Sequence, residues 1–312
     1  VLACGGIETP RLMLASRDVR AAGVGNEHDL VGRFLIDHPG ARVARFNAAD
    51  SAAINRLFGF VSVPHGGAVH PYMHGLTLSP QVQERYGLLN AALFMMGERA
   101  PNNPWDALKR LATRQTGKPV GDLWSVIAHG GLVTKGLAIK ALQHPRTPGA
   151  VKAMLRAAAK IADRSYDDGV YRYGGLPHKL DYIDVDVLME QTPDPESRIT
   201  LSRREDRFGL PLPQADWRIG GQARGTLAQL CTLMAQDFRT AGLPVPEFVD
   251  WAKAERWDEA VLIDSGHMMG TTRMAADPKR GVVDADCKVH GVDNLHIAGG
   301  AVFPTGGHAN PT

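Results

Sequence analysis

Residues 267–312 read HMMGTTRMAADPKRGVVDADCKVHGVDNLHIAGGAVFPTGGHANPT, and this stretch carries more chemical information than any other part of the chain. It places His267 ahead of a Gly-Thr turn, continues through a short β run, and ends in a glycine-rich loop that closes on Asn310-Pro311-Thr312. A histidine is a suitable general base near pH 7, and an amide can hold an oxygen on which negative charge develops. The segment is therefore predicted to contribute the polar side chains of an active site.

The same segment resembles the C-terminal signature of the glucose-methanol-choline (GMC) oxidoreductases, flavoenzymes that take a hydride from an alcohol carbon. The resemblance also covers the first 46 residues and residues 193–219, but it does not extend over residues 105–164. It implies FAD as the cofactor and a small-molecule alcohol or sugar as the substrate. The motifs HMMGTTRM and VVDADCKVHGVDNL are similar to the corresponding sequences of bacterial members that act on sugars and glycosides, which favours that substrate class.

The resemblance also implies the catalytic roles. His267 stands where the family places the base that removes the hydroxyl proton, and Asn310 stands at a second position that carries either His or Asn in family members. His308 is the alternative for that second position. Asn310 is preferred because Asn310-Pro311-Thr312 matches the family's helix start, and proline is favoured in a first helical turn. His308 is then expected to line the site or to brace its loop.

Two glycine pairs are expected to approach the cofactor. Gly299 and Gly300 follow a short strand pattern, and Gly5 and Gly6 follow the apolar run of residues 1–3. Such a pair is often only a turn, but at the carboxyl end of a strand it can bring bare backbone close to a nucleotide. The N–H groups of a helix start favour an anion such as a reduced flavin. The predicted cofactor-binding residues are Gly5, Gly6, Gly299, Gly300, Pro311 and Thr312.

Composition excludes several other classes. The net charge of +2 is too small to indicate a nucleic-acid-binding protein, and no apolar run reaches the roughly 18 to 20 residues of a transmembrane helix. Cys4, Cys231 and Cys287 are widely scattered without a CxxC spacing, so they are predicted to be buried free thiols rather than metal ligands.

No GxGxxG fingerprint is present and the chain does not begin with methionine. We therefore expect a piece of a longer enzyme that is inactive when isolated.

The periodicity predicts several elements. Residues 1–3 read as a strand, followed by a glycine turn and a helix that starts near Arg11 after Glu8-Thr9-Pro10. Residues 41–46, 184–190, 197–202 and 214–219 are predicted strands, the last three forming an antiparallel meander. Residues 225–241 have a helical period that ends at Gly242, and this helix is expected to pack on the back of the sheet.

These elements predict an α+β fold. The expected parts are a fragment of a Rossmann-like, GMC-type FAD-binding domain at residues 1–32 and a substrate-binding domain at residues 33–262 with a mainly antiparallel sheet backed by helices. Residues 263–312 are expected to return to the FAD domain with the catalytic residues. A helical insertion at about residues 103–165 interrupts the substrate domain.

The insertion is strongly basic, with eleven Lys or Arg against three Asp over residues 106–164. It is predicted to be either a solvated helical face or a docking surface for a partner or an electron acceptor. The chain as a whole is predicted to belong to an FAD-dependent oxidoreductase acting on CH-OH groups, with oxygen, a quinone or a partner protein as the electron acceptor. The alternative is a truncated relative without cofactor that serves as a binding module.

Overall fold

The structure is a computed structural model that describes residues 1–65, 68–144, 146–162 and 179–311. Helices and strands alternate irregularly along the chain, in keeping with an α+β fold. In chain order the described elements are α1 Gly5–Ala15, β1 Gly40–Phe46, α2 Ala48–Phe58, β2 Phe60–His65, β3 Ala68–Met73, β4 Gly75–Thr77, α3 Pro80–Tyr86, β5 Ala91–Arg99, α4 Pro104–Ala112, α5 Pro119–Ala128, α6 Gly130–Gln143, α7 Gly149–Ala162, β6 Leu180–Met189, β7 Arg198–Glu205, β8 Pro211–Asp216, α9 Gly221–Thr240, β9 Glu247–Phe248, α10 Asp250–Lys253, and the 3₁₀ helices η2 Trp257–Glu259 and η3 Gly300–Val302.

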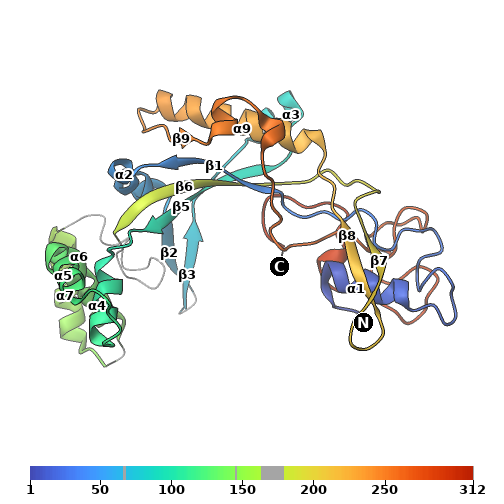
Figure 1. Cartoon of the computed structure of the whole chain (residues 1–312), viewed down its shortest axis with the longest axis horizontal. Helices are drawn as coiled ribbons and strands as arrows, with labels where there is room; N and C mark the ends of the chain where they lie inside the picture. The colour runs from blue at the N-terminus through green and yellow to red at the C-terminus, as the bar shows by residue number, and fades with distance from the viewer. Residues whose placement is uncertain (66–67, 145, 163–178, 312) are drawn as a thin grey trace.

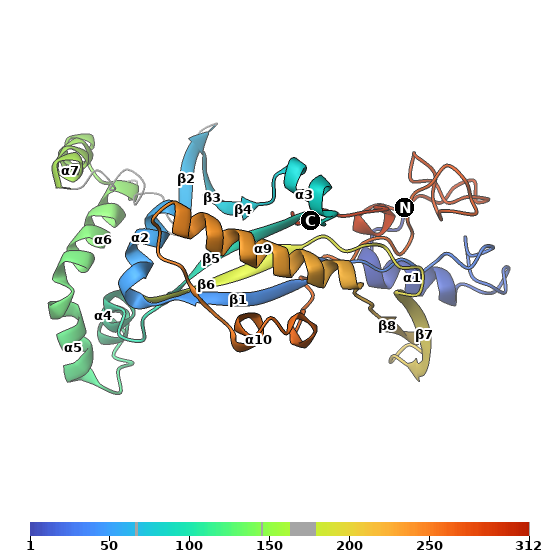
Figure 2. The same ribbon diagram turned by 90° about the horizontal axis from the view of Figure 1, so that it is seen from above.

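The larger lobe is built on a five-stranded sheet in the order β4-β5-β6-β1-β9, in which every neighbouring pair is antiparallel. On β6, alternate residues Ile183, Val185 and Val187 are buried and belong to the main apolar core. Helix α9 lies across this face of the sheet (Figure 2) and adds Leu227, Leu230, Met234 and Phe238 to the same core. The predicted helix on the back of the sheet is confirmed.

The opposite face of the central strands carries charge. Asp184 is fully buried between Arg45, whose Nε lies 2.7 Å from one carboxylate oxygen, and Arg42, whose guanidinium lies 2.5 Å from the other. Arg42 also pairs with Asp186 at 2.9 Å, two residues further along β6. Since residues i and i+2 of a strand share a face, the sheet has one apolar side under α9 and one ionic side.

A second core forms the smaller lobe, which contains α1, the β7–β8 hairpin and the C-terminal loops (Figure 1). Its buried residues come from both ends of the chain: Met13, Leu14, Val31, Val282, Val283, Val289, Ile297 and Val302. Hairpin β7–β8 packs on α1. It therefore contacts residues of the predicted FAD-domain fragment, although it lies within the range assigned to the substrate domain.

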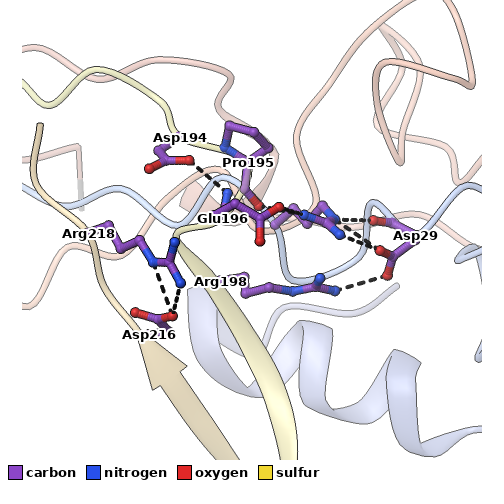
Figure 3. Close-up of polar contacts among 8 residues, drawn as sticks. Asp29, Asp194, Pro195, Glu196, Arg198, Asp216 and Arg218 are labelled. Atoms are coloured by element: carbon purple, nitrogen blue, oxygen red, sulfur yellow. Dashed lines mark hydrogen bonds and ion pairs between the residues drawn. The ribbon is translucent and has the colours of Figure 1, made fainter.

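An ion-pair network fastens this hairpin to the N-terminal loop (Figure 3). Asp29 accepts from Arg198 at 2.9 Å and from Arg33 at 2.5 Å, and Arg33 also pairs with Glu196. All of these residues lie at the start of β7 or in the loop after α1. Exposed pairs of this kind contribute little singly, but here two chain segments share one carboxylate–guanidinium cluster.

The helical insertion projects from the far end of the larger lobe, away from α1 in both views (Figures 1 and 2). Helix α5 begins at Pro119, and α6 and α7 are separate helices. A further break at His129 separates α5 from α6 ahead of Gly130-Gly131, where helix propensity is low. Among the described residues, no helix has the length and apolarity needed to cross a membrane. Positions 145 and 163–165 of the predicted insertion lie outside the described residues.

Three sequence-based expectations are wrong. The predicted meander is formed only in its second half: β7 and β8 pair antiparallel as predicted, but β6 belongs to the five-stranded sheet. Pro193 and Pro195, which lack N–H groups, lie where the chain leaves that sheet. Helix α1 starts at Gly5 and contains Pro10, instead of starting after it. Cys231 is buried, which raises the pKa of its thiol to about 12, but Cys4 is exposed.

Candidate active site

The loop that carries His267 is fixed by the buried carboxylate of Asp37. One Asp37 oxygen accepts from the backbone N–H of Gly266 at 3.0 Å, and the other accepts from the N–H of His267 at 3.1 Å and of His38 at 2.6 Å. Charged hydrogen bonds of this kind compensate the desolvation of a buried carboxylate. A residue 230 positions earlier in the chain thereby sets the backbone at the predicted base.

His38, next to Asp37, is buried and held in one tautomer. Its Nδ1 lies 2.7 Å from the carbonyl oxygen of Gly307, which can only accept, so Nδ1 carries a proton. Burial lowers the pKa of His38, which favours the neutral ring with a lone pair on Nε2. Nε2 is buried and has no hydrogen-bond partner among the described residues. The ring centroids of His38 and His267 are 5.8 Å apart, with the planes tilted by 59°.

His308 docks the C-terminal loop onto the sheet. Its backbone N–H donates to Oδ1 of Asn90 at 3.0 Å, and its ring Nδ1 points to the same oxygen. Asn90, just before β5, is itself bonded through its backbone to Glu190 at the end of β6. Burial lowers the pKa of His308, and the nearby His38 ring lowers it further. We call His38, His267 and His308 the histidine cluster.

Asn310 and Pro311 are exposed at the end of the same loop, a few residues after Gly307, whose carbonyl holds His38. The structure brings Asn310 into the loop that the histidine cluster anchors, and its role at the substrate oxygen stays a prediction. Thr312 lies outside the described residues. Among the described residues, no three His, Cys, Asp or Glu side chains are grouped as metal ligands would be.

The two predicted glycine pairs lie side by side. Leu2 and Ile297 form a parallel bridge, in which Leu2 donates to the carbonyl of His296 and accepts from the N–H of Ala298, both at 2.8 Å. Because the strands are parallel, the glycines that follow them emerge at the same edge. Gly5 and Gly299 are exposed, have φ of +78° and +114°, and leave open space where a Cβ would stand. This bare edge fits close approach by a nucleotide cofactor.

Gly6 has a different constraint, because a Cβ there would stand 2.4 Å from the carbonyl oxygen of Met268. Glycine at this position is required by the close packing of α1 on the His267 loop. The first turn of α1, the glycine edge and the loop of the predicted base therefore form one continuous structure.

A side chain of that loop also supplies a hydrogen-bond donor that the backbone of α1 lacks. Pro10 lies inside the helix and has no N–H to donate to the carbonyl of Gly6, four residues earlier. The hydroxyl of Thr271, which is fully buried, donates to that carbonyl at 2.7 Å. In the Gly270-Thr271-Thr272 sequence, which was predicted only as a turn, Thr271 thus also stabilises α1.

Sequence reasoning missed the residues that organise this site. None of Asp37, His38 and Asn90 is among the site residues predicted from the sequence. The available signal was an Asp-His pair directly after the apolar run of residues 34–36. That signal is weak, because nothing in it specifies a partner more than 200 residues away.

Comparison with known proteins gives a family for the C-terminal residues. The family model described as GMC oxidoreductase matches residues 193–312, which include His267, His308 and Asn310. The C-terminal portion of this chain belongs to the GMC oxidoreductase family. The resemblance stated from the sequence is therefore confirmed for this GMC portion. Asp37, His38 and Asn90, which hold its loops, come from outside the matched residues.

Relatives of this chain match it over different lengths. The large subunit of a fructose dehydrogenase from Gluconobacter japonicus is 24% identical over 319 residues, covering 100% of this chain and 44% of the relative. A 6'''-hydroxyparomomycin C oxidase from Streptomyces lividus is 29% identical over 138 residues, covering 44% of this chain and 24% of the relative. A solved structure of a formate oxidase aligns over 99% of this chain and 50% of its own, with 18% identity and a TM-score of 0.47. The chain spans less than half the length of these two curated relatives.

Proposed function

We propose that this chain is the substrate-oxidising portion of an FAD-dependent oxidoreductase that acts on the CH-OH group of a sugar, a glycoside or another alcohol. The observation that carries the proposal is the setting of His267, whose backbone is held by the buried Asp37 carboxylate beside the ring of a buried histidine. The names of the two curated relatives, the large subunit of a fructose dehydrogenase and a 6'''-hydroxyparomomycin C oxidase, support the sugar or glycoside class.

In this proposal His267 removes the hydroxyl proton while the carbon gives up its hydride. Asn310 holds the substrate oxygen as negative charge develops on it, and its exposed position at the loop end leaves it open to a ligand. His308 braces the loop through Asn90. A base works best when its position is fixed before the substrate arrives, and the three N–H bonds to Asp37 supply that fixation.

His38 acts as a positioning residue rather than as a second base. Its Nδ1 proton is committed to Gly307, and its lowered pKa keeps the ring neutral when His267 becomes protonated beside it. A neutral neighbour does not repel the imidazolium that forms on His267. The His38 ring therefore supports both the loop geometry and the proton transfer.

FAD, when bound, supplies the hydride acceptor at its N5 atom. Gly5, Gly6, Gly299 and Gly300 are proposed to hold it by close backbone approach, with Pro311 and Thr312 contributing main-chain groups. Residues 1–32 and 263–312 are proposed to belong to the FAD-binding domain, and residues 33–262 to the substrate domain. The shared core of α1 with Val282, Val283 and Ile297 supports the first of these assignments.

The test uses the protein expressed from its complete reading frame and a panel of sugars, glycosides and simple alcohols, with either oxygen or an artificial dye as acceptor. His267→Ala is expected to lower kcat by roughly 10² to 10⁴, the contribution of a general base, with flavin absorbance unchanged. His28→Ala, an exposed histidine, is the matched control. Full turnover by His267→Ala would refute the base assignment. The isolated 312-residue chain is predicted to be inactive in the same assay.

A further inference from the structure

Helix α5 is turned so that its apolar side faces water. Val120, Leu123, Trp124 and Ile127 follow the i, i+3, i+4, i+7 spacing of one helix face. Their exposed fractions are 81%, 52%, 69% and 61%, respectively. We call these four residues the apolar stripe. In a helix that served only to complete a core, this face would be the buried one.

The polar side of α5 is buried instead, and specific bonds hold it there. Asp122 accepts from Nε of Arg110 at 3.0 Å and from the hydroxyl of Thr116 at 2.6 Å. Together these two groups lower the pKa of Asp122 to about 2. Ser125 donates to the carbonyl of Asn102 at 2.5 Å. Because both sides of the contact are polar and paired, rotating α5 to hide the apolar stripe would break these bonds.

The surroundings of the apolar stripe are cationic. Residues 104–162 contain ten Lys or Arg and two Asp, with no Glu. Lys109, Arg114 and Lys118 are exposed on α4 and in the loop that leads into α5. Leu137 on α6 and Met154 on α7 add exposed apolar side chains to the same insertion. A solvated helical face accounts for the charges but not for the exposed Trp, Leu and Ile.

Charge and composition favour a lipid surface as the occupant. Six of the ten cations are lysines, a residue type that is depleted in protein–protein interfaces. An apolar helix face with a tryptophan, flanked by cations, is the pattern of helices that lie in the headgroup region of an anionic bilayer. The insertion stands at the end of the molecule remote from α1 (Figure 2), so contact there leaves α1 uncovered.

We propose that the helical insertion docks on an anionic bilayer surface, with the apolar stripe entering the boundary between headgroups and acyl chains and Lys109, Arg114 and Lys118 contacting lipid phosphates. The bilayer replaces the water that the stripe would otherwise contact. This inference is independent of the oxidoreductase chemistry, because no residue of the histidine cluster takes part.

Flotation with lipid vesicles tests the proposal on the protein from the complete reading frame. Binding is expected to vesicles of phosphatidylglycerol mixed with phosphatidylcholine, to be weak for phosphatidylcholine alone, and to fall at high salt. Trp124→Ser/Ile127→Ser is expected to lower the partition coefficient about tenfold or more, since binding scales with buried apolar area. Changing Lys109, Arg114 and Lys118 to Gln is expected to lower it by roughly a hundredfold at low salt.

The matched control is Phe208→Ser/Val261→Ser, which removes an exposed aromatic and an exposed aliphatic side chain outside the insertion and is expected to bind as the wild type does. Equal binding by the stripe variant and the wild type would overturn the proposal, as would a lack of preference for anionic lipid. Sedimentation velocity without lipid supplies a further check. A self-association that the stripe variant abolishes, in a protein that ignores vesicles, would assign the stripe to a second copy of the chain and overturn the lipid assignment.

Discussion

The histidine cluster and the helical insertion both bury polar groups, but the partners are separated by very different distances along the chain. At the histidine cluster, buried polar groups are joined across the chain: Asp37 bonds the backbone 230 residues away at His267, and His38 bonds Gly307 over 269 residues. In the helical insertion the buried polar contact is local, since Arg110 and Asp122 are 12 residues apart, and the apolar stripe is exposed. Distant segments meet at the site, whereas the insertion is a local unit whose apolar face is exposed.

The largest effect is expected where the site depends on one carboxylate. Asp37→Ala leaves the N–H groups of His38, Gly266 and His267 without their acceptor and should lower the free energy of unfolding by about 3 kcal/mol. Urea denaturation measures this change in stability. The Asp37→Ala variant of the complete protein should also lose activity. Asp264→Ala, at an exposed carboxylate near the same loop, is the control and should be nearly neutral. Equal stability of the two variants would remove Asp37 from its organising role.

Two adjacent buried threonines in the site differ in whether the side-chain hydroxyl has a hydrogen-bond partner. Thr271→Val should destabilise by about 1 to 3 kcal/mol, because the Gly6 carbonyl loses its donor. Thr272→Val should be neutral or stabilising, because the buried Thr272 hydroxyl has no partner among the described residues. Both side chains are fully buried, so size and burial are matched.

Pro10→Ala extends this test, because alanine restores an N–H that can reach the Gly6 carbonyl. The cost of Thr271→Val should therefore be smaller in a Pro10→Ala background than in the wild type. Additive free energies of unfolding in this cycle would contradict the account of α1.

A smaller effect is expected from pH. The pKa values of His38 and His308 are lowered in the folded state, so the unfolded chain takes up more protons as the pH falls through the ordinary value of 6.5. Stability should be fully present above that value and decline on acidification below it. His38→Gln should flatten the dependence of Tm on pH, whereas His28→Gln at an exposed position should leave it unchanged. An unchanged slope in His38→Gln would mean that His38 is not a buried neutral ring.

The smallest effect is expected on the apolar stripe. Trp124→Ser and Ile127→Ser should each change the free energy of unfolding by less than about 0.5 kcal/mol, as exposed substitutions do. Asp122→Ala in the same helix should destabilise more, because it removes the partner of Arg110. If instead the apolar substitutions were the damaging ones, α5 would pack in the opposite orientation.

Much of the architecture could be predicted from local patterns. The strand predicted at residues 184–190 corresponds to β6, and the helical period of residues 225–241 identified α9. The order of residues in the C-terminal segment was sufficient to name the family. The partner of a strand was not predictable, and the meander from β6 to β7 failed because pairing is decided by long-range packing.

By itself the sequence determined the family of the C-terminal portion, the candidate base His267 and the basic character of the insertion, because each depends on residue type and spacing along a short stretch. Only the tertiary structure decided that Asp37 and His38 organise the site, that Thr271 compensates for Pro10, and that α5 turns its apolar side outward. These are contacts between segments or choices of which helix face is buried. Both depend on how the whole chain packs, which no local pattern records.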